Sequence, residues 1–262
     1  MFQKYLKEEL NYINKELISV SKQSSELRNV LSDFLVGSSK CIRSIITLLY
    51  LKANNVKVSE SSLKIIVAGE IIHNASLLHD DVIDNAKERR GQQSINSKYS
   101  SHFSIILGDY LLKFAIEKLL EVDNKEILNI FFNTIQNMCE SEIKQFLSRD
   151  SKNDIEDYIK ICKGKTASLF MAILKSCAII EGIDSSKASI FAENFGVLFQ
   201  LRNDLKLTSI IDDKNNKIYT ARDIIGLDKT YDLIENYKEK IFFILSSLPN
   251  NIYVREFEDI IN

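Results

Sequence analysis

Apolar residues recur along this chain at the spacing of an α-helix, not at the alternating spacing of a β-strand. Ile65, Ile66 and Ile72 fall on one side of a helical segment, and Leu111 and Ala115 repeat the pattern further on. The 262 residues include 1 proline and 8 glycines, which leaves little of the turn chemistry that a β-sheet protein needs. The sequence therefore predicts an all-α protein.

Polar breaks divide the chain into the expected helical segments. We expect helices at residues 2–20, 24–35, 40–53, 60–84, 101–121, 125–148, 154–181, 185–206 and 227–246. Asp154 and Asp184 stand where helix N-caps belong. No long Pro/Gly/Ser linker and no obvious repeat interrupts the pattern, so we expect a single domain over residues 1–262.

Composition and charge exclude several classes of partner. Hydrophobic residues make up 45% of the chain and charged residues 27%, and the net charge is −2. Without a basic excess we expect no nucleic-acid partner. No run approaches the roughly 18 apolar residues of a membrane span. The 4 cysteines are far apart and the first residues do not resemble a signal peptide, so we expect a cytoplasmic protein with reduced thiols.

Carboxylates cluster at the end of one buried-looking helical segment. The stretch LLHDDVIDNAKERRG (77–91) contains Asp80, Asp81 and Asp84, followed by Arg89 and Arg90. On a helix Asp80 and Asp84 share a face, and Asp81 is turned about 100° away. Carboxylates at a helix C-terminus oppose the macrodipole, so a purely structural sequence would favour lysine there.

Three interpretations of this cluster follow from the residues alone. The aspartates could be a solvated helix end, or they could bind Mg²⁺ shared with substrate phosphates, with the arginines as fork-shaped phosphate donors. The third is a di-iron bundle, because Glu70 and His73 form an E-x-x-H pair. That interpretation needs a second such pair, and neither His79 nor His102 follows a carboxylate by three residues. The first two interpretations remain open at this level.

Six short motifs in a fixed order extend the pattern across most of the chain. They are Gly37–Arg43 (GSSKCIR), Asp80–Asp84 with the following Arg-Arg-Gly, Ile106–Tyr110 (ILGDY), Glu142–Gln145 (EIKQ), Lys165-Thr166, and Phe195–Gln200 (FGVLFQ). From about residue 35 to about residue 230, the chain resembles the trans-isoprenyl diphosphate synthases, the polyprenyl synthetase family.

The resemblance implies a fold and a reaction. It implies the isoprenoid synthase fold, a single-domain helical bundle with a deep central cavity, as a homodimer or as a heteromer with another synthase subunit. It also implies Mg²⁺-assisted condensation of isopentenyl diphosphate with an allylic diphosphate. Loss of diphosphate leaves an allylic cation, and the double bond of isopentenyl diphosphate attacks it.

The resemblance implies three roles for residues that act on the allylic diphosphate. The catalytic residues would be Asp80, Asp81, Asp84 and Lys165. The metal ligands would be the same three aspartates together with Asp204. Arg89 and Lys165 would contact the allylic diphosphate, with Thr166 and Gln200 lining its pocket.

For isopentenyl diphosphate, the resemblance implies a second set of residues. These are Lys40, Arg43, His73 and Arg90. Lys40 and Arg43 could equally be ordinary charges on a helix surface, and His73 could be a satisfied core histidine.

The second aspartate-rich motif of the family is degenerate in this chain. Its positions read Asn203, Asp204, Leu205, Lys206 and Leu207, so only Asp204 keeps a carboxylate. Asp212-Asp213 follows, but as a shifted motif it is speculative. Two hypotheses follow, an active prenyltransferase or a non-catalytic paralogue that serves as partner subunit of an active synthase. The intact first motif favours activity.

We expect residues on the helix that carries the aspartates to determine the length of the product. A growing chain running back along that helix would meet Ala75 and Ser76 first, and both are small. The resemblance associates bulky aromatic residues here with products that stop at farnesyl length, so we expect a longer product. We also expect surface-like positions for Asp80 and Asp81, whose replacement should remove activity and leave the fold intact.

Overall fold

The computed structural model describes residues 4–36, 41–151 and 154–261, and the chain divides into two compact units. The N-terminal unit consists of residues 1–52 and 57–125, and the C-terminal unit of residues 53–56 and 126–262. The single domain and the deep cavity expected from the sequence stay predictions.

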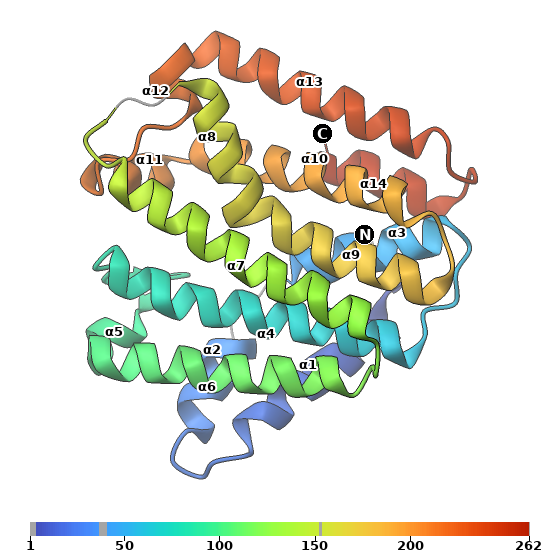
Figure 1. The fold of residues 1–262 in the computed structure, drawn as a ribbon, viewed down its shortest axis with the longest axis horizontal. Helices are drawn as coiled ribbons and strands as arrows, with labels where there is room; N and C mark the ends of the chain where they lie inside the picture. The colour runs from blue at the N-terminus through green and yellow to red at the C-terminus, as the bar shows by residue number, and fades with distance from the viewer. Residues whose placement is uncertain (1–3, 37–40, 152–153, 262) are drawn as a thin grey trace. The chain divides into compact units, whose positions relative to one another are not determined.

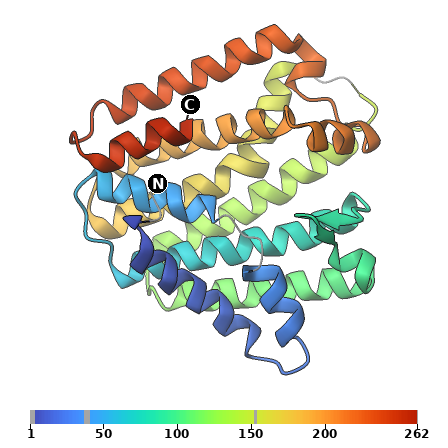
Figure 2. The same cartoon turned by 180° about the vertical axis from the view of Figure 1, so that it is seen from behind.

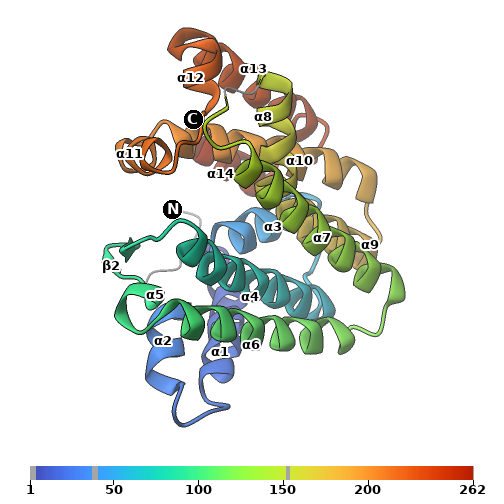
Figure 3. The ribbon, with the colours of Figure 1, turned by 60° about the vertical axis from the view of Figure 1, so that its left-hand side comes forward.

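The N-terminal unit consists of helices and one short β-hairpin. Its helices are α1 (Lys7–Ser21), α2 (Arg28–Val36), α3 (Ile42–Ala53), α4 (Glu60–Ile83), α5 (Ile95–Lys98) and α6 (Ser101–Leu120). Between α4 and α5, β1 (Glu88–Arg89) pairs antiparallel with β2 (Gln92–Gln93). Helices α4 and α6 lie side by side, and α1 packs against α2 and α4 (Figures 1 and 3).

Helix α4 is the buried centre of this unit and carries the three aspartates at its end. Ser59 caps its N-terminus by accepting the backbone N–H of Ser62. The apolar run from Ile65 to Ile72 is buried almost throughout, as an all-round apolar helix requires. Gly108 on α6 faces the imidazole of His79, and a Cβ there would overlap the ring. The glycine therefore allows α6 to approach the end of α4 closely.

The C-terminal unit contains the remaining helices. They are α7 (Lys125–Leu147), α8 (Ile155–Cys162), a π-helical turn (Lys163–Ala167), α9 (Ser168–Glu181), α10 (Ser185–Asp204), α11 (Leu207–Asn215), α12 (Ala221–Ile225), α13 (Leu227–Leu245) and α14 (Ile252–Ile261). Helix α10 packs against α9 and α13 (Figures 1 and 2). Its core is aromatic: Phe191 contacts Phe257 edge-on, and Phe170 contacts Phe195, with ring centroids 5.2 and 5.5 Å apart.

The all-α prediction is confirmed, because the described residues contain helices and a single two-stranded hairpin. Both predicted N-caps are confirmed as well: Asp154 accepts the N–H of Asp157, and Asp184 that of Lys187. Across residues 4–36, 41–151 and 154–261, no helix combines the length and the apolar character needed to cross a bilayer.

The structure differs from the sequence prediction at several places. The helix expected over 154–181 contains a π-helical turn in its middle. No helix was expected between residues 206 and 227, but α11 and α12 occupy much of that stretch. Helix α11 was hidden by its polar sequence, LTSIIDDKN, which has no continuous apolar face. The hairpin and α14 were also not predicted.

Candidate active site

The three aspartates of the first motif lie at the C-terminal end of α4. Asp84 is its C-cap: the Asp84 N–H donates to the Asp80 carbonyl oxygen, and the following N–H, of Asn85, donates to that of Val82. Asp80 and Asp84 are half-buried, whereas Asp81 is 0% exposed. The surface-like position expected for Asp81 is therefore wrong: its 100° rotation from the other two turns it into the protein.

Arg89 on β1 is the partner of Asp81. Its Nε donates to Asp81 Oδ1 at 2.7 Å, and its Nη2 donates to the same oxygen. The other oxygen, Oδ2, is buried and has no hydrogen-bond partner. Burial raises the pKa of Asp81, and Arg89 opposes that rise. A buried carboxylate oxygen without a donor is an acceptor that a hard cation would satisfy, so this cluster fits Mg²⁺.

The β-hairpin that follows α4 fixes both arginines. Arg90 and Gly91 occupy its two turn positions with φ of 56° and 77°, as a type I′ turn requires. Positive φ is costly for arginine, by roughly 1 kcal/mol or more, so the surrounding structure must impose it. Asn96 does part of this by donating from Nδ2 to the Asp81 carbonyl oxygen at 3.0 Å, and Ser94 Oγ donates to the Ala86 carbonyl oxygen at 2.6 Å.

Arg43, His73 and Arg90 come together, as the resemblance implied. Burial lowers the pKa of His73 well below its usual value, and the nearby cations Arg43 and Arg90 lower it further. His73 is therefore a neutral imidazole at pH 7. Arg43 is buried on α3, and burial lowers its pKa to about 10 against the raising effect of Glu70. Lys40, the fourth residue of this set, lies outside the described residues.

Glu70 has a structural partner, which explains its place beside His73. Its Oε1 accepts the backbone N–H of Ser44 at 3.1 Å and the Ser44 hydroxyl at 2.6 Å. Glu70 therefore anchors the first turn of α3, which carries Arg43. Nowhere in the described residues do three His, Cys, Asp or Glu side chains converge as a ready metal cage.

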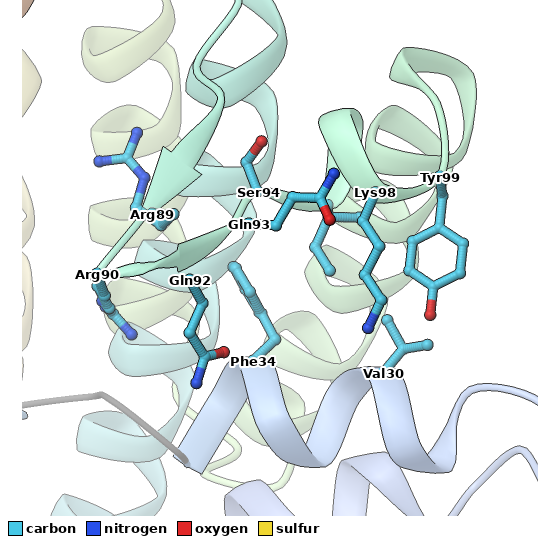
Figure 4. A pocket seen from close by; sticks show the side chains of 10 residues that line it. Val30, Phe34, Arg89, Arg90, Gln92, Gln93, Ser94, Lys98 and Tyr99 are labelled. Atoms are coloured by element: carbon cyan, nitrogen blue, oxygen red, sulfur yellow. The ribbon is translucent and has the colours of Figure 1, made fainter.

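A cleft of about 530 Å³, partly open to solvent, lies beside the hairpin within the same unit. The residues that line it come from α2, the hairpin and α5 (Figure 4), and they are Val30, Phe34, Arg89, Arg90, Gln92, Gln93, Ser94, Ile95, Lys98 and Tyr99. Phe34 and Val30 form its apolar floor, and the Lys98 side chain runs toward Val30. The cleft places cationic and amide groups next to the arginines.

The predicted chain-length residues lie one to two turns before Asp80 on α4. Ala75 is fully buried. Ser76 is half-buried, and its hydroxyl donates to the His73 carbonyl oxygen at 2.9 Å. Both side chains are small, and their role in product length stays a prediction.

In the C-terminal unit, Lys165 and Thr166 share the π-helical turn. Such turns often mark functional positions, because they rotate one side chain out of the regular helical order. Lys165 Nζ lies 2.5 Å from Glu142 Oε2 and donates to Gln145 Oε1 at 2.7 Å, both on α7. Gly164 makes this packing feasible, because a Cβ at that position would overlap Ser141.

Thr166, Gln200, Asp204 and Tyr158 form a continuous hydrogen-bond chain. The Thr166 hydroxyl donates to Gln200 Oε1 at 2.7 Å, and Gln200 Nε2 donates to Asp204 Oδ1 at 2.6 Å. Tyr158 Oη donates to Asp204 Oδ2 at 2.5 Å. Sequence reasoning missed Tyr158. Its spacing of seven residues, two helical turns before Lys165, was the only signal.

The remaining positions of the degenerate motif do not present ligands. Helix α10 ends at Asp204, and Leu207, the first residue of α11, is 73% exposed. Lys206 Nζ donates to Asn203 Oδ1 at 2.9 Å, so the amide oxygen already accepts a hydrogen bond from an ammonium group. Both oxygens of Asp204 and the amide oxygen of Asn203 already accept hydrogen bonds, and Leu207 has no ligand atom, so these three motif positions do not fit a metal ion, in contrast to Asp81.

Asp213 on α11 is a carboxylate whose setting the sequence did not predict. Its Oδ2 is buried without a hydrogen-bond partner, and burial together with the nearby Asp204 raises its pKa to about 8. Asp213 therefore lies close enough to Asp204 to affect its charge, although the sequence treated it as beyond the motif.

Comparison with protein families places this geometry in context. The family model described as polyprenyl synthetase matches residues 24–240. The chain belongs to the polyprenyl synthetase family. It is 32% identical to a prenyl transferase of Cyanidium caldarium over 76% of this chain and 64% of that protein. It is 35% identical to the decaprenyl-diphosphate synthase of Dictyostelium discoideum over 71% and 42%, respectively. A third relative, heptaprenyl diphosphate synthase component 2 of Geobacillus stearothermophilus, is 30% identical over 77% and 64%. The chain thus spans less than two thirds of the length of these polyprenyl synthetase relatives.

Solved structures of the family share the fold. A heptaprenyl diphosphate synthase from Staphylococcus aureus superposes with a TM-score of 0.90 at 21% identity, over 98% of this chain and 96% of that one. A polyprenyl synthase from Caulobacter crescentus, complexed with calcium and isoprenyl diphosphate, has a TM-score of 0.89 at 22% identity over 99% and 95%. These matches establish the isoprenoid synthase fold of the polyprenyl synthetases for this chain.

Proposed function

We propose that the chain is a prenyltransferase that condenses isopentenyl diphosphate with an allylic diphosphate. The observation that carries the proposal is the buried, unpartnered oxygen of Asp81 next to a hairpin that holds two arginines. Anionic oxygens and fixed guanidinium groups side by side suit a ligand that brings both a metal ion and phosphates.

The aspartates of α4 would hold the metal. Mg²⁺ bound by Asp80, Asp81 and Asp84 would stabilise negative charge on the departing diphosphate. Arg89 already lies against Asp81, so it is placed to accompany the same diphosphate. Lys165 would add a further positive charge, released from Glu142 and Gln145 when phosphate oxygens replace them. The calcium and isoprenyl diphosphate in the Caulobacter crescentus protein support this choice of ligands.

Isopentenyl diphosphate would be held by Arg43, His73 and Arg90, with Lys40 as the fourth member. The two arginines supply fixed forks for phosphate oxygens. His73, kept neutral by its surroundings, can donate one N–H without adding charge to an already cationic set. Apolar walls would keep water away from the allylic cation, and the proton released on condensation would pass to the departing diphosphate.

We further propose that the product is longer than farnesyl diphosphate. The small side chains of Ala75 and Ser76 support this, as do the names of the heptaprenyl and decaprenyl relatives. Replacing either residue by phenylalanine should shorten the product ladder while the first condensation still proceeds, because a close-packed helix face has no spare volume for a phenyl ring. An unchanged ladder would mean that the product grows along another path. Ile105→Phe, at an exposed position on α6, is the matched control.

A second candidate function is a non-catalytic partner subunit of an active synthase. Two observations favour it: the ammonium of Lys206 on Asn203, and the absence of ligands at Leu207. The relative named heptaprenyl diphosphate synthase component 2 supports a heteromer, whereas the general family pattern supports a homodimer. We also propose a cytoplasmic setting, which the four reduced cysteine thiols support.

One assay separates these candidates. Purified chain is incubated with Mg²⁺, labelled isopentenyl diphosphate and a panel of allylic primers, and the products are sized. Elongated products from the chain alone support the enzyme. Silence with every primer, followed by stimulation of an added synthase subunit, would instead support the partner subunit.

A further inference from the structure

Asp204 is the sole remaining carboxylate of the degenerate motif, and its surroundings differ from those of a metal ligand. The side chain is 7% exposed, and each oxygen accepts a hydrogen bond, from Tyr158 at one side and Gln200 at the other. Burial disfavours a charge here, and the two short hydrogen bonds compensate for it. Asp81, in contrast, keeps one buried oxygen without a donor.

The two bonds of Asp204 have a directional consequence. Because a carboxylate only accepts, the amide end of Gln200 that faces Asp204 must be its NH₂ group. The carbonyl end, Oε1, then points to Thr166 and accepts its hydroxyl proton at 2.7 Å. One acidic side chain thereby sets the orientation of the next two polar groups in the chain, up to the residue beside Lys165.

We propose that Asp204 is a positioning residue that orients Gln200 and Thr166 toward the allylic diphosphate and binds no metal ion. This rests on the proposed function, because the diphosphate is the ligand that Lys165 and Thr166 would contact. It also gives Tyr158 a role: its hydroxyl holds the second oxygen of Asp204 and fixes the carboxylate plane.

The first test counts metal ions and needs no turnover. Mn²⁺ binding to the full chain is followed by electron paramagnetic resonance, with inorganic diphosphate as the probe ligand at a concentration that saturates every variant. Asp80→Asn should weaken Mn²⁺ binding at least tenfold. Asp204→Asn should bind Mn²⁺ within twofold of the unchanged chain, as should the exposed control Asp232→Asn. A loss in Asp204→Asn comparable to that in Asp80→Asn would overturn the proposal.

The second test measures the positioning role. Tyr158→Phe and Asp204→Asn should each weaken the binding of inorganic diphosphate, measured by calorimetry with Mn²⁺, by about three- to tenfold, the range of one or two lost hydrogen bonds. The double variant should be little worse than either single one, because both changes disrupt the same chain. Tyr231→Phe, an exposed tyrosine on α13, is the control. Unchanged diphosphate binding in both single variants would overturn the positioning role.

These tests stay separate from the test of the proposed function. If the unchanged chain makes no product with any primer, the prenyltransferase proposal fails, whereas Mn²⁺ and diphosphate binding still decide the role of Asp204. If it does make products, Tyr158→Phe should raise the KM for the allylic diphosphate and leave both the KM for isopentenyl diphosphate and the Mg²⁺ concentration at half-maximal rate unchanged. A rise in the Mg²⁺ requirement of Asp204→Asn would overturn the proposal.

Discussion

In the N-terminal unit, Asp81 is completely buried and keeps one oxygen without a hydrogen-bond partner, whereas in the C-terminal unit Asp204 has a donor on each oxygen. Both are aspartates near the end of a helix, and burial raises the pKa of both. The hydrogen bonding of Asp81 is incomplete without a ligand, whereas that of Asp204 is satisfied by side chains of the protein itself. An acidic residue in a family motif position is therefore a metal ligand only if its surroundings leave it an acceptor to offer.

The neighbours of each aspartate explain the difference. Asp80 and Asp81 lie in the last turn of α4, Asp84 is its C-cap, and the hairpin that follows supplies Arg89. At Asp204 the helix ends, and Leu207 starts a new helix in an exposed position. This chain therefore differs from the family motif in two ways: two carboxylates are replaced, and the helix ends at Asp204 instead of continuing through the motif.

The largest effect expected from this comparison is at Asp81. Asp81→Asn should lower the rate of condensation by about 10² to 10³, the usual cost of removing one group that stabilises charge in the transition state. It should also lower stability slightly, because Arg89 loses its charged partner; Arg89 is partly exposed and can be rehydrated. Product formation and thermal melting measure the two effects. If this variant kept the full rate of condensation, the assignment of the metal site to α4 would be wrong.

A second prediction separates the two diphosphates. Arg43→Gln should raise the KM for isopentenyl diphosphate, and Lys165→Gln should raise the KM for the allylic primer, each by about 10- to 100-fold, since a charge-assisted hydrogen bond contributes about 1.5–3 kcal/mol. Steady-state kinetics with one substrate saturating measures each constant. The exposed Arg255→Gln and Lys163→Gln, whose lysine pairs with Glu193, are the matched controls. If both variants affected the same substrate, the assignment of the two clusters would be wrong.

Asp213 in the C-terminal unit and His73 in the N-terminal unit should affect stability with opposite pH dependence. Burial raises the pKa of Asp213 to about 8 from an ordinary value of 3.8, so the folded state holds this proton more tightly than the unfolded state. Its contribution to stability is complete below about pH 3.8 and is lost as the pH rises toward 8. The lowered pKa of His73 has the reverse effect: its contribution is lost as the pH falls below the ordinary value of 6.5.

Asp213→Asn tests this on the C-terminal side. The variant cannot ionise, so at pH 8.5 it should be more stable than the unchanged chain by about 1 kcal/mol after allowance for partial exposure, or ~2–4 °C in Tm. The gain should disappear near pH 4. Melting curves across this range, with Asp232→Asn as control, measure it. A gain that is equal at both pH values would exclude titration of Asp213 as the cause.

The sequence predicted the N-terminal cluster better than the C-terminal one for a physical reason. Asp80, Asp81 and Asp84 are close in sequence, so helical geometry alone predicted which two share a face and which one turns away. Tyr158 and Asp204 are 46 residues apart, and Glu142 and Lys165 meet only because α7 packs on the π-helical turn. Hydrophobic periodicity locates helices but does not say which polar side chains meet between them.

Motif reasoning also assigned residue types without their surroundings. It placed Asp204 among the metal ligands because of its position, and nothing local in the sequence indicated that Tyr158 and Gln200 would fill both oxygens. The end of α10 was predicted to within two residues, at 206 instead of Asp204, but nothing local indicated that a new helix starts at Leu207. Lys206 was the one warning, as a cation within a metal motif.

The smallest expected effect is from restoring the motif. Asn203→Asp together with Leu207→Asp recreates the family's carboxylates in sequence, and we expect the rate of Mg²⁺-dependent condensation to change by less than about twofold. Leu207 is the first residue of α11 and 73% exposed, so a new aspartate there would interact with the N-terminus of that helix instead of joining Asp204. An aspartate at 203 would gain the ammonium of Lys206, which already contacts Asn203 Oδ1, and would be neutralised by it.

The informative control adds Lys206→Ala to the pair, because it removes the competing cation while the helix break remains. If the rate of the triple variant is also unchanged, the end of the helix at Asp204 is what prevents metal binding at this motif. A tenfold rise in the double variant would show that the two missing carboxylates alone limit the enzyme and that Asp204 can still bind a metal ion.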